Sequence, residues 1–468
     1  MQTTATVFRQ LVHLLFLTGK YVACVKTRWP LILAALMAAL GAVAQAAGPF
    51  DVQGQANSEY PSLFELYRHL HANPELSFEE SKTSARLQEE LGKAGFQVTG
   101  NVGGYGFVGV LRNGAGPTVM IRTDLDALPV TEKTDLEYAS QVKAKDDRGD
   151  EVGVMHACGH DVHMTCFVGT ARVLSQLKDR WRGTVIMIGQ PAEERGGGAK
   201  AMLAAGLFQK FPKPDYILAL HDDATLEAGM VGVVEGPALA GANSVDVTIR
   251  GVSGHGAWSY TTKDPIVLAA QTVLGLQTIV SREMRAIDPA VVTVGSIHGG
   301  TKHNIIPDEV QLQLSIRFFN DAVRSRLLAG IERIAKGMAQ AAGVPSEREP
   351  VVKVREEESI GPTVNNPELT RRVGNAIAGI LGKDKVVPRD PVMGGEDFGR
   401  FGRTTENIPI CIFWLGAVSR EKIEISQKPG GKPLPSLHSS VFAPTPEPAI
   451  KTGVKAMTAA ALDLLGKK

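Results

Sequence analysis

The chain has 468 residues, of which 44% are hydrophobic and 21% are charged, so it is long enough for two or three domains with sizeable cores. Its 50 lysines and arginines nearly balance 49 aspartates and glutamates, and the formal net charge is +1. A charge this close to zero gives no electrostatic basis for binding nucleic acid or an anionic membrane surface, so we expect no nucleic-acid partner.

The N-terminal region has the pattern of an export signal. Basic residues from Lys20 to Arg28 precede an apolar run at 31–43, which is short for a membrane span and ends in a small-x-small cleavage pattern at 44–46. We predict a signal peptide over residues 1–46, cleaved after Ala46, and a mature protein in the periplasm. The alternative is that the segment remains as a membrane anchor.

The first half of the mature chain contains three predicted buried strands, each followed by polar residues. Amphipathic helices at 60–71 and 79–91 precede them. The strands, at 118–122, 184–189 and 216–220, lead respectively to Asp124 and Asp126, to Glu193 and Glu194, and to His221. Open α/β sheets bind ligands at the carboxyl ends of their strands, so we expect these side chains to approach one another.

The densest group of potential metal ligands is the stretch Met155–His163. It holds a thiol, three imidazoles and a carboxylate, and a predicted helix at 164–177 follows it. Thiols and imidazoles are ligands of zinc-like metals, and Gly159 lets the backbone bend so that they converge. Taken alone, the stretch is equally compatible with a histidine-rich surface turn.

The cysteines allow two interpretations that exclude each other. Cys158, Cys166 and Cys411 remain after removal of the signal peptide. In an oxidising compartment Cys158 can pair with Cys166 as a disulfide. A disulfide-bonded Cys158 cannot bind metal as a thiolate, so it is either paired or a ligand.

From residue 244 the pattern becomes that of a second domain. The predicted elements are a strand at 245–249, a helix at 264–284 capped by Asp264, strands at 291–297 and 310–318, a helix at 323–341 and a strand at 351–356. This β-α-β-β-α-β order is ferredoxin-like. A helix at 367–381, a strand at 408–415 and a helix at 446–465 then resume the first pattern. We predict an α/β catalytic domain with a mixed sheet, formed by 51–243 and 358–468, with an inserted α+β domain at 244–357.

Five short motifs occur in a characteristic order. They are His156-Ala157-Cys158-Gly159-His160-Asp161, Gln190-Pro191-Ala192-Glu193-Glu194, Gly254-His255-Gly256-Ala257, Gly394-Gly395-Glu396-Asp397-Phe398 and Leu437-His438-Ser439. Together they resemble the M20 metallopeptidase family, specifically its amidohydrolase branch of hippurate hydrolases, N-acyl-amino-acid deacylases and auxin-conjugate hydrolases. The resemblance spans nearly the whole mature chain, and five ordered motifs are far more specific than one.

The resemblance implies a catalytic domain that binds two divalent metal ions, with zinc or manganese favoured over cobalt or nickel. Its implied ligands are Cys158 as the bridge, His160, Glu194, His221 and His438. A thiolate suits the bridging position because two adjacent cations need an anion between them. Asp124, Asp126 and Asp161 are candidate hydrogen-bond acceptors for the second nitrogens of the ligand histidines. Asp222 and Asp223, which follow His221, are candidates to compete for metal.

The resemblance implies hydrolysis of the amide bond of N-acyl amino acids, such as hippurate-like compounds, by a metal-activated water. Glu193 is the candidate general base, because a carboxylate committed to a cation, as Glu194 would be, is a weak base. The alternatives are a dipeptidase or carboxypeptidase of the same fold, and an exported binding protein without catalysis. The expected substrate is a small N-acyl amino acid or a short peptide.

In the inserted domain the resemblance indicates a homodimer interface or lid. His255 would reach the partner's active site and stabilise the tetrahedral oxyanion, and Asn304 and Arg317 would hold the substrate carboxylate. Trp258 and Tyr260 depart from the family pattern near the expected mouth of the site. Two further histidines outside this domain are given no catalytic role: His71 is expected to end the first helix, and His163 to be a surface or packing residue.

Overall fold

The structure is a computed structural model that describes residues 51–146 and 148–467. The predicted export segment, residues 1–46, lies outside the described residues. Within the described part of the chain, no helix is both long enough and apolar enough to cross a membrane.

The larger of the two main sheets has nine strands of mixed direction. Its order is β1 (Gln97–Thr99), β2 (Phe107–Asn113), β6 (Trp181–Gln190), β3 (Thr118–Asp124), β7 (Tyr216–Glu227), β18 (Ile410–Val418), β8 (Val231–Val233) and β17 (Val386–Pro388), with β19 (Gly466–Lys467) beside β6. The four central strands β6, β3, β7 and β18 are parallel. The strand β18 is buried along its whole length, as parallel strands covered on both faces are, and the predicted mixed-sheet α/β class is confirmed.

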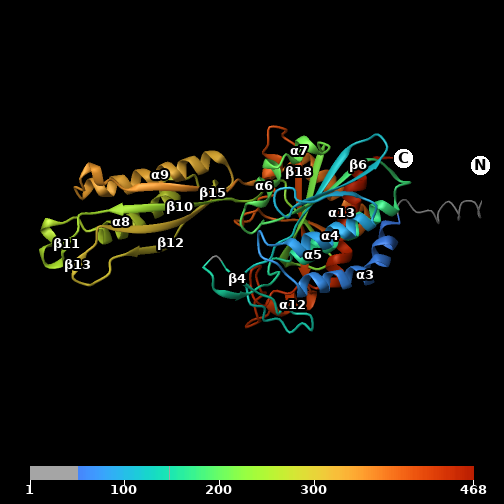
Figure 1. Ribbon diagram of the computed structural model, residues 1–468, viewed down its shortest axis with the longest axis horizontal. Coiled ribbons are helices and arrows are strands. Elements are labelled where there is room, and N and C mark those ends of the chain that lie inside the picture. Colours follow the sequence, from blue (N-terminus) through green and yellow to red (C-terminus); the bar gives the residue numbers. More distant parts are fainter. Residues whose placement is uncertain (1–50, 147, 468) are drawn as a thin grey trace, which may run out of the picture. The chain divides into compact units, whose positions relative to one another are not determined.

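Helices cover both faces of this sheet (Figure 1). The helices α3 (Val52–Ala72), α5 (His160–Gln176) and α13 (Pro446–Leu464) pack on one another, with α4 (Ser81–Lys93) against α5 and α10 (Pro367–Leu381) against α13. On the other side, α6 (Gly198–Ala204), α7 (Leu207–Lys210) and α11 (Gly399–Gly402) contribute Met202, Phe208 and Phe401 to a shared apolar core. The polar strand ends therefore lie at the rim of an otherwise apolar three-layer structure.

The register of the parallel strands brings the predicted polar residues level with one another. Asp124 at the end of β3 is paired with Gln190 at the end of β6. Ile121 is paired with Leu218 of β7, so His221, three residues further on, lies level with Asp124. One edge of the sheet therefore carries the polar residues of three strands.

The smaller main sheet is ferredoxin-like, as its element order predicts. The antiparallel strands β12 (Ala290–Gly299), β14 (Glu309–Phe318), β10 (Gly241–Arg250) and β15 (Val351–Ile360) lie in that order, and α8 (Pro265–Thr278) and α9 (Asp321–Ala341) pack against β14 and β10. Asp264 caps α8 by accepting the N–H of Ile266 at 2.9 Å. The helix predicted to reach 284 ends at Thr278, and a π-helical turn, Ile279–Glu283, follows it.

Short strands complete the described chain. A two-stranded sheet of β11 (Gly254–His255) and β13 (Ile305–Ile306) extends the ferredoxin-like part, and β9 (Gly236–Leu239) pairs with β16 (Thr363–Asn365). The segment 134–151, expected from its sequence to be a polar excursion, contains one strand and the start of another in the hairpin of β4 (Lys143–Lys145) and β5 (Glu151–Gly153). The helix α12 (Arg420–Ser426) precedes the loop that carries His438.

Candidate metal centre

A tight turn before α5 positions the first two candidate ligands. Gly159 has a φ of +81°, and a Cβ atom there would lie 2.4 Å from Oδ2 of Asp222, so only glycine fits. The helix begins at His160 immediately afterwards. Cys158 and His160 therefore flank the positive end of the α5 dipole, which favours a thiolate.

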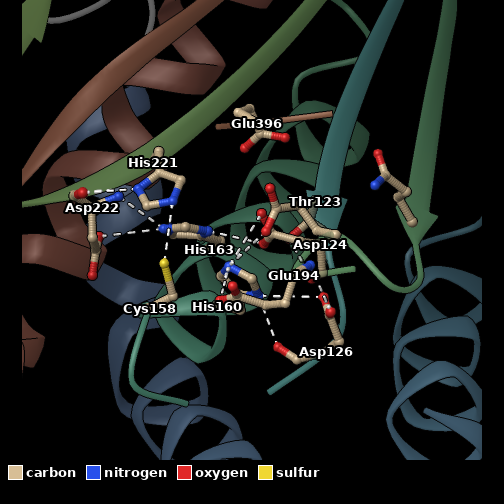
Figure 2. Close-up of polar contacts among 12 residues, drawn as sticks. Thr123, Asp124, Asp126, Cys158, His160, His163, Glu194, His221, Asp222 and Glu396 are labelled. Carbon is tan, nitrogen blue, oxygen red and sulfur yellow. Dashed lines mark hydrogen bonds and ion pairs between the residues drawn. The ribbon is translucent and has the colours of Figure 1, made fainter. Parts of the chain in front are cut away.

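Main-chain carbonyls orient two of the candidate histidine ligands. Nδ1 of His160 lies 2.8 Å from the main-chain oxygen of Asp126, and Nδ1 of His221 lies 2.9 Å from that of Asp222. A carbonyl only accepts, so each Nδ1 carries a proton, and Nε2 is the ring nitrogen that is available to a cation. Nε2 of His221 is 3.5 Å from Sγ of Cys158, and Figure 2 shows the two side chains pointing toward each other.

The C-terminal part of the chain supplies the last candidate ligand. The main-chain N–H of His438 donates to the oxygen of Ala157 at 2.8 Å, and its Nε2 lies 3.5 Å from Oε1 of Glu194. His438 has a φ of +65°, and Ala192, beside the candidate base Glu193, has a φ of +48°. Left-handed backbone at non-glycine residues costs on the order of 1 kcal/mol and gathers at functional sites.

The donor set fits divalent cations. Nε2 of His160 and Oε1 of Glu194 are buried and lack hydrogen-bond partners within the described residues, which is costly unless a cation satisfies them. Two compatible groups share the thiol of Cys158: one with His160 and His221, the other with Glu194 and His438, each with ligand atoms within 4.8 Å of one another. Nitrogen, sulfur and carboxylate donors together suit zinc and neighbouring transition metals.

A buried arginine organises the acidic side of the site. Arg122 on β3 donates to Asp124 at 2.6 Å, to Gln190 at 3.0 Å and to Glu396 at 2.9 Å. Its side chain is fully buried, and the Glu396 and Asp124 carboxylates outweigh burial and raise its pKa. One guanidinium cannot neutralise all the surrounding carboxylates, because Glu193 and Asp397 also lie within one cluster with Glu396. The site keeps an excess of negative charge.

That excess appears in the pKa values of the acids. Burial, and then the neighbouring Glu396 and Glu194 carboxylates, raise the pKa of Glu193 well above its usual range. Burial raises the pKa of Glu194 to about 7, and it raises the pKa of the Cys158 thiol well above its usual value. Bound cations reverse each of these effects, since they stabilise the ionised forms. The centre is therefore built for positive charge.

His163 and His156, the other two histidines of the 155–163 stretch, are both buried, and of the two only His163 has side-chain hydrogen-bond partners among the described residues. His163, expected to be a surface or packing residue, is buried; its Nδ1 donates to Asp124 at 2.9 Å and its Nε2 accepts the N–H of Asp222 at 2.8 Å. It lies near enough to Asp124 and His160 to form a metal-binding group, but neither ring nitrogen is free. His156 is a buried imidazole whose pKa burial lowers to about 4.

The three aspartates predicted to accept hydrogen bonds from the ligand histidines have other side-chain partners. Asp126 orients His160 through its main-chain oxygen, whereas the Asp124 carboxylate accepts from His163 and Arg122. Asp161 accepts from His71 at 2.6 Å rather than from a candidate ligand. Its side chain points away because it follows His160 directly on the same helix.

The two residues after His221 do not join the ligand group. Asp223 pairs with Arg389 at 2.7 Å, and Asp222 faces Nε2 of His163 at 3.8 Å. Among the described residues, neither belongs to a group able to hold a metal ion. All three described cysteines, Cys158, Cys166 and Cys411, are buried and free, which agrees with the ligand interpretation of Cys158.

A cavity of about 600 Å³ opens over these residues. Its walls include Cys158, Glu193, Glu194, His221 and His438, and also Arg317 from β14. Arg317 is half-buried, its pKa is lowered by burial, and it has no hydrogen-bond or ion-pair partner among the described residues. The structure thus brings Arg317 to the candidate metal centre.

Two predicted residues do not reach this cavity within one chain. His255 and Asn304 are exposed, and neither lines the cavity of about 600 Å³. They lie together at the small sheet of β11 and β13, where the N–H of Gly256 donates to the oxygen of Asn304 at 2.9 Å. Trp258 and Tyr260, expected near the mouth, are also exposed and absent from its walls.

Sequence reasoning missed several residues that hold the site together. Arg122 lies in the predicted strand and Glu396 in a quoted motif, but only the fold brings them within 2.9 Å. Glu80 is buried, and its carboxylate accepts the N–H groups of Phe78 and Ala192, which fixes the turn before Glu193. A glutamate at the start of an amphipathic helix carries no signal of such burial.

The comparison with protein families identifies the class of the protein. Residues 120–430 match the model of peptidase family M20/M25/M40. The protein is a metal-dependent hydrolase that acts on amide or peptide bonds, and an exported binding protein without catalysis is not retained as an alternative. The chain belongs to peptidase family M20/M25/M40, as its five motifs predicted.

Individual relatives in this family align with most of the chain. Thermostable carboxypeptidase 2 of Saccharolobus solfataricus is 37% identical over 77% of this chain and 87% of its own. IAA-amino acid hydrolase ILR1-like 4 of Arabidopsis thaliana is 33% identical over 86% of this chain and 85% of its own. The structure of the YXEP protein of Bacillus subtilis, a dinuclear metal binding peptidase, matches with a TM-score of 0.71 and 28% identity, covering 87% of this chain and 99% of that one.

His71 provides a test of the buried charges behind the site. Burial lowers its pKa, but hydrogen bonds to Asp161 at 2.6 Å and Glu132 at 3.0 Å outweigh burial and raise it to about 10. Because the folded-state pKa exceeds the unfolded value, this stabilisation is complete below about pH 6.5 and is lost as the pH rises through about 10.

We expect His71→Gln to lower the free energy of unfolding by about 3 kcal/mol at pH 6, since it leaves two buried carboxylates unpaired. The difference in free energy of unfolding between wild type and variant, measured by urea unfolding, should shrink as the pH approaches 10. His69→Gln, a neighbouring histidine on the same helix, is the control. A deficit that does not change with pH would contradict the charged state of His71.

Proposed function

We propose that this hydrolase cleaves the amide bond of N-acyl amino acids. The observation that carries the proposal is Arg317, a cation without a partner among the described residues, in the same cavity as the candidate metal ligands. An arginine binds a carboxylate by two parallel hydrogen bonds, and a free α-carboxylate is what an N-acyl amino acid presents near its scissile amide.

In the proposed mechanism, two divalent cations, zinc or manganese, would be held by Cys158, His160, Glu194, His221 and His438. They would supply Lewis-acid chemistry to the amide carbonyl and to the attacking water. Glu193 takes a proton from the attacking water and passes it to the leaving amine nitrogen. Arg317 orients the substrate so that its carbonyl faces Glu193.

A carboxypeptidase or dipeptidase is the second candidate, and the similarity to a thermostable carboxypeptidase favours it. Peptides also end in a free carboxylate, so Arg317 suits both classes. A dipeptidase differs at the other end of the substrate, because a dipeptide carries an ammonium group where an N-acyl amino acid is neutral. Rates on N-acetyl-Ala-Phe and Ala-Phe therefore identify a dipeptidase. Rates on N-acetyl-Phe and N-acetyl-Ala-Phe identify a carboxypeptidase, which needs a peptide bond between two amino acids.

We also propose a homodimer in which the ferredoxin-like part contributes to the partner's site. Trp258, Tyr260 and Leu274 expose large apolar surfaces, and β12 is an edge strand with exposed Ile297. Exposed apolar patches and unpaired strand edges are typical of protein interfaces. In such a dimer, His255 stabilises the oxyanion and Asn304 assists with the substrate carboxylate in the partner's cavity.

Export to the periplasm with cleavage after Ala46 remains part of the proposal, and the basic and apolar pattern of residues 20–46 supports it. Amino-terminal sequencing of the protein from a native-like host tests it. A retained segment 1–46 would favour the membrane anchor.

The role of Glu193 predicts a separation of metal binding from turnover. We expect Glu193→Gln to keep its bound metal, measured by elemental analysis, but to hydrolyse N-benzoylglycine about 10³-fold more slowly, because the proton acceptor is lost. Glu368→Gln, an exposed change on α10, should keep both its bound metal and the wild-type rate. Loss of metal from Glu193→Gln would make Glu193 a ligand instead, and an unchanged rate would remove it from the mechanism.

The role of Arg317 predicts a loss that depends on the substrate's charge. Arg317→Met should lower kcat/KM for N-benzoylglycine about 10²-fold, because it removes the binding free energy of two charge-assisted hydrogen bonds. The same variant should hydrolyse N-benzoylglycinamide, in which an uncharged carboxamide replaces the α-carboxylate, nearly as fast as the wild type does. Arg326→Met, on the exposed side of α9, is the control. Equal losses on both substrates would show that Arg317 does not bind the carboxylate.

The dimer predicts complementation between two inactive proteins. Glu193→Gln and His255→Ala should each be inactive, but their co-expression should restore about a quarter of the activity, since mixed dimers contain one site with both residues intact. Co-expression of Glu193→Gln with the Glu193→Gln, His255→Ala double variant is the control. No recovery in the first mixture would contradict a histidine supplied in trans.

A further inference from the structure

A second cavity adjoins the candidate metal centre. It has a volume of about 500 Å³, within the range of small-molecule sites, and four of its lining residues also line the first cavity: Val392, Gly394, Trp414 and Leu437. The two spaces therefore share one wall of largely apolar side chains. No step of the proposed mechanism uses the second cavity.

The shared wall lies beside two candidate ligands. Trp414 is the register partner of His221 on β18, and the two rings lie 5.6 Å apart. Leu437 immediately precedes His438. Trp414 and Leu437 therefore border the place where His221 and His438 would hold a metal ion and the substrate carbonyl.

The second cavity has both apolar and charged lining residues. Pro388, Pro391 and Val392 line it together with Trp414. Asp223 pairs with Arg389 at 2.7 Å and accepts the hydroxyl of Thr225 at 2.6 Å, whereas the buried carboxylate of Asp222 has no hydrogen-bond partner among the described residues and Asp390 is exposed. The lining cation, Arg389, is already paired, so the cavity suits an uncharged group whose chain packs on the apolar residues.

We infer that the second cavity is the acyl subsite, and that the protein takes apolar acyl groups of six or more carbons in preference to acetyl. The inference rests on the proposed function, because it assigns the α-carboxylate to Arg317 and the carbonyl to the metal centre. The amide nitrogen on one side of the carbonyl carbon then leads to the α-carboxylate at Arg317, which lines the first cavity and not the second. The acyl chain is the substituent left to extend past Trp414 and Leu437 into the second cavity. Burial in the second cavity should raise kcat/KM about fourfold per methylene until the cavity is filled.

The test compares N-acylglycines from acetyl to octanoyl in wild-type protein and in Pro391→Trp. Pro391 lines the second cavity and not the first, so a tryptophan there fills the proposed subsite. We expect the octanoyl-to-acetyl ratio of kcat/KM to fall at least tenfold. Asp390→Trp, on the same rim, is the second variant should the first fold poorly. Pro433→Trp, an exposed proline that lines a different cavity, should leave the ratio unchanged.

Binding of octanamide to the metal-free protein, measured by calorimetry, gives a readout that does not need turnover. Octanamide is neutral, so the acidic centre does not repel it and Arg317 does not attract it. Wild-type protein should bind octanamide, and Pro391→Trp should lose that binding. Equal octanamide binding by both proteins, or an unchanged kinetic ratio, would overturn the inference. So would a change in preference for the amino acid, glycine against phenylalanine, instead of for the acyl chain. Octanamide binding that Pro391→Trp abolishes, without cleavage of any N-acylglycine, would overturn the proposed function alone.

Discussion

Uncompensated buried negative charge is the constraint on which the site depends. Arg122 is the buried cation that joins the end of β3 to the loop before α11, and it contacts Asp124 and Glu396. The carboxylates of Glu193 and Glu194 lie beyond its reach in the same low-dielectric region, where their pKa values are raised. Burial of such groups is tolerated only when further positive charge is supplied, so the stability of this region and its affinity for cations have one origin.

The geometry of the centre is set largely by main-chain atoms. Carbonyl oxygens of Asp126 and Asp222 orient His160 and His221, and the carbonyl of Ala157 anchors the loop of His438. Main-chain groups move less than side chains do, because each belongs to a strand end or to a turn before a helix. The donor atoms are therefore held in place before any cation binds, and little ordering is left to oppose binding.

The sequence predicted the fold well where its signal was periodic. The central strands of both sheets and the long helices were located to within a few residues, apart from the ends of α3, α8 and β7. The strand β7 continues to Glu227, so His221 lies inside it and not after it as predicted. The strands β2, β8 and β17 were among those missed: β2 and β8 contain glycine and β17 ends in proline, so they show no clear alternation. The candidate ligands followed from motif resemblance. The contacts of His71, His163 and Arg122 did not, since a buried hydrogen bond between distant segments leaves no pattern in either segment.

The loop of His438 has a consequence for the order of assembly. The candidate ligands come from the start of α5, the end of β6, the middle of β7 and a loop near the C-terminus. A chain that emerges from the ribosome N-terminus first cannot complete this ligand set until the loop of His438 has docked on Ala157. The complete ligand set thus forms late in folding, and a cation can be held by all of these residues only after the loop of His438 has docked.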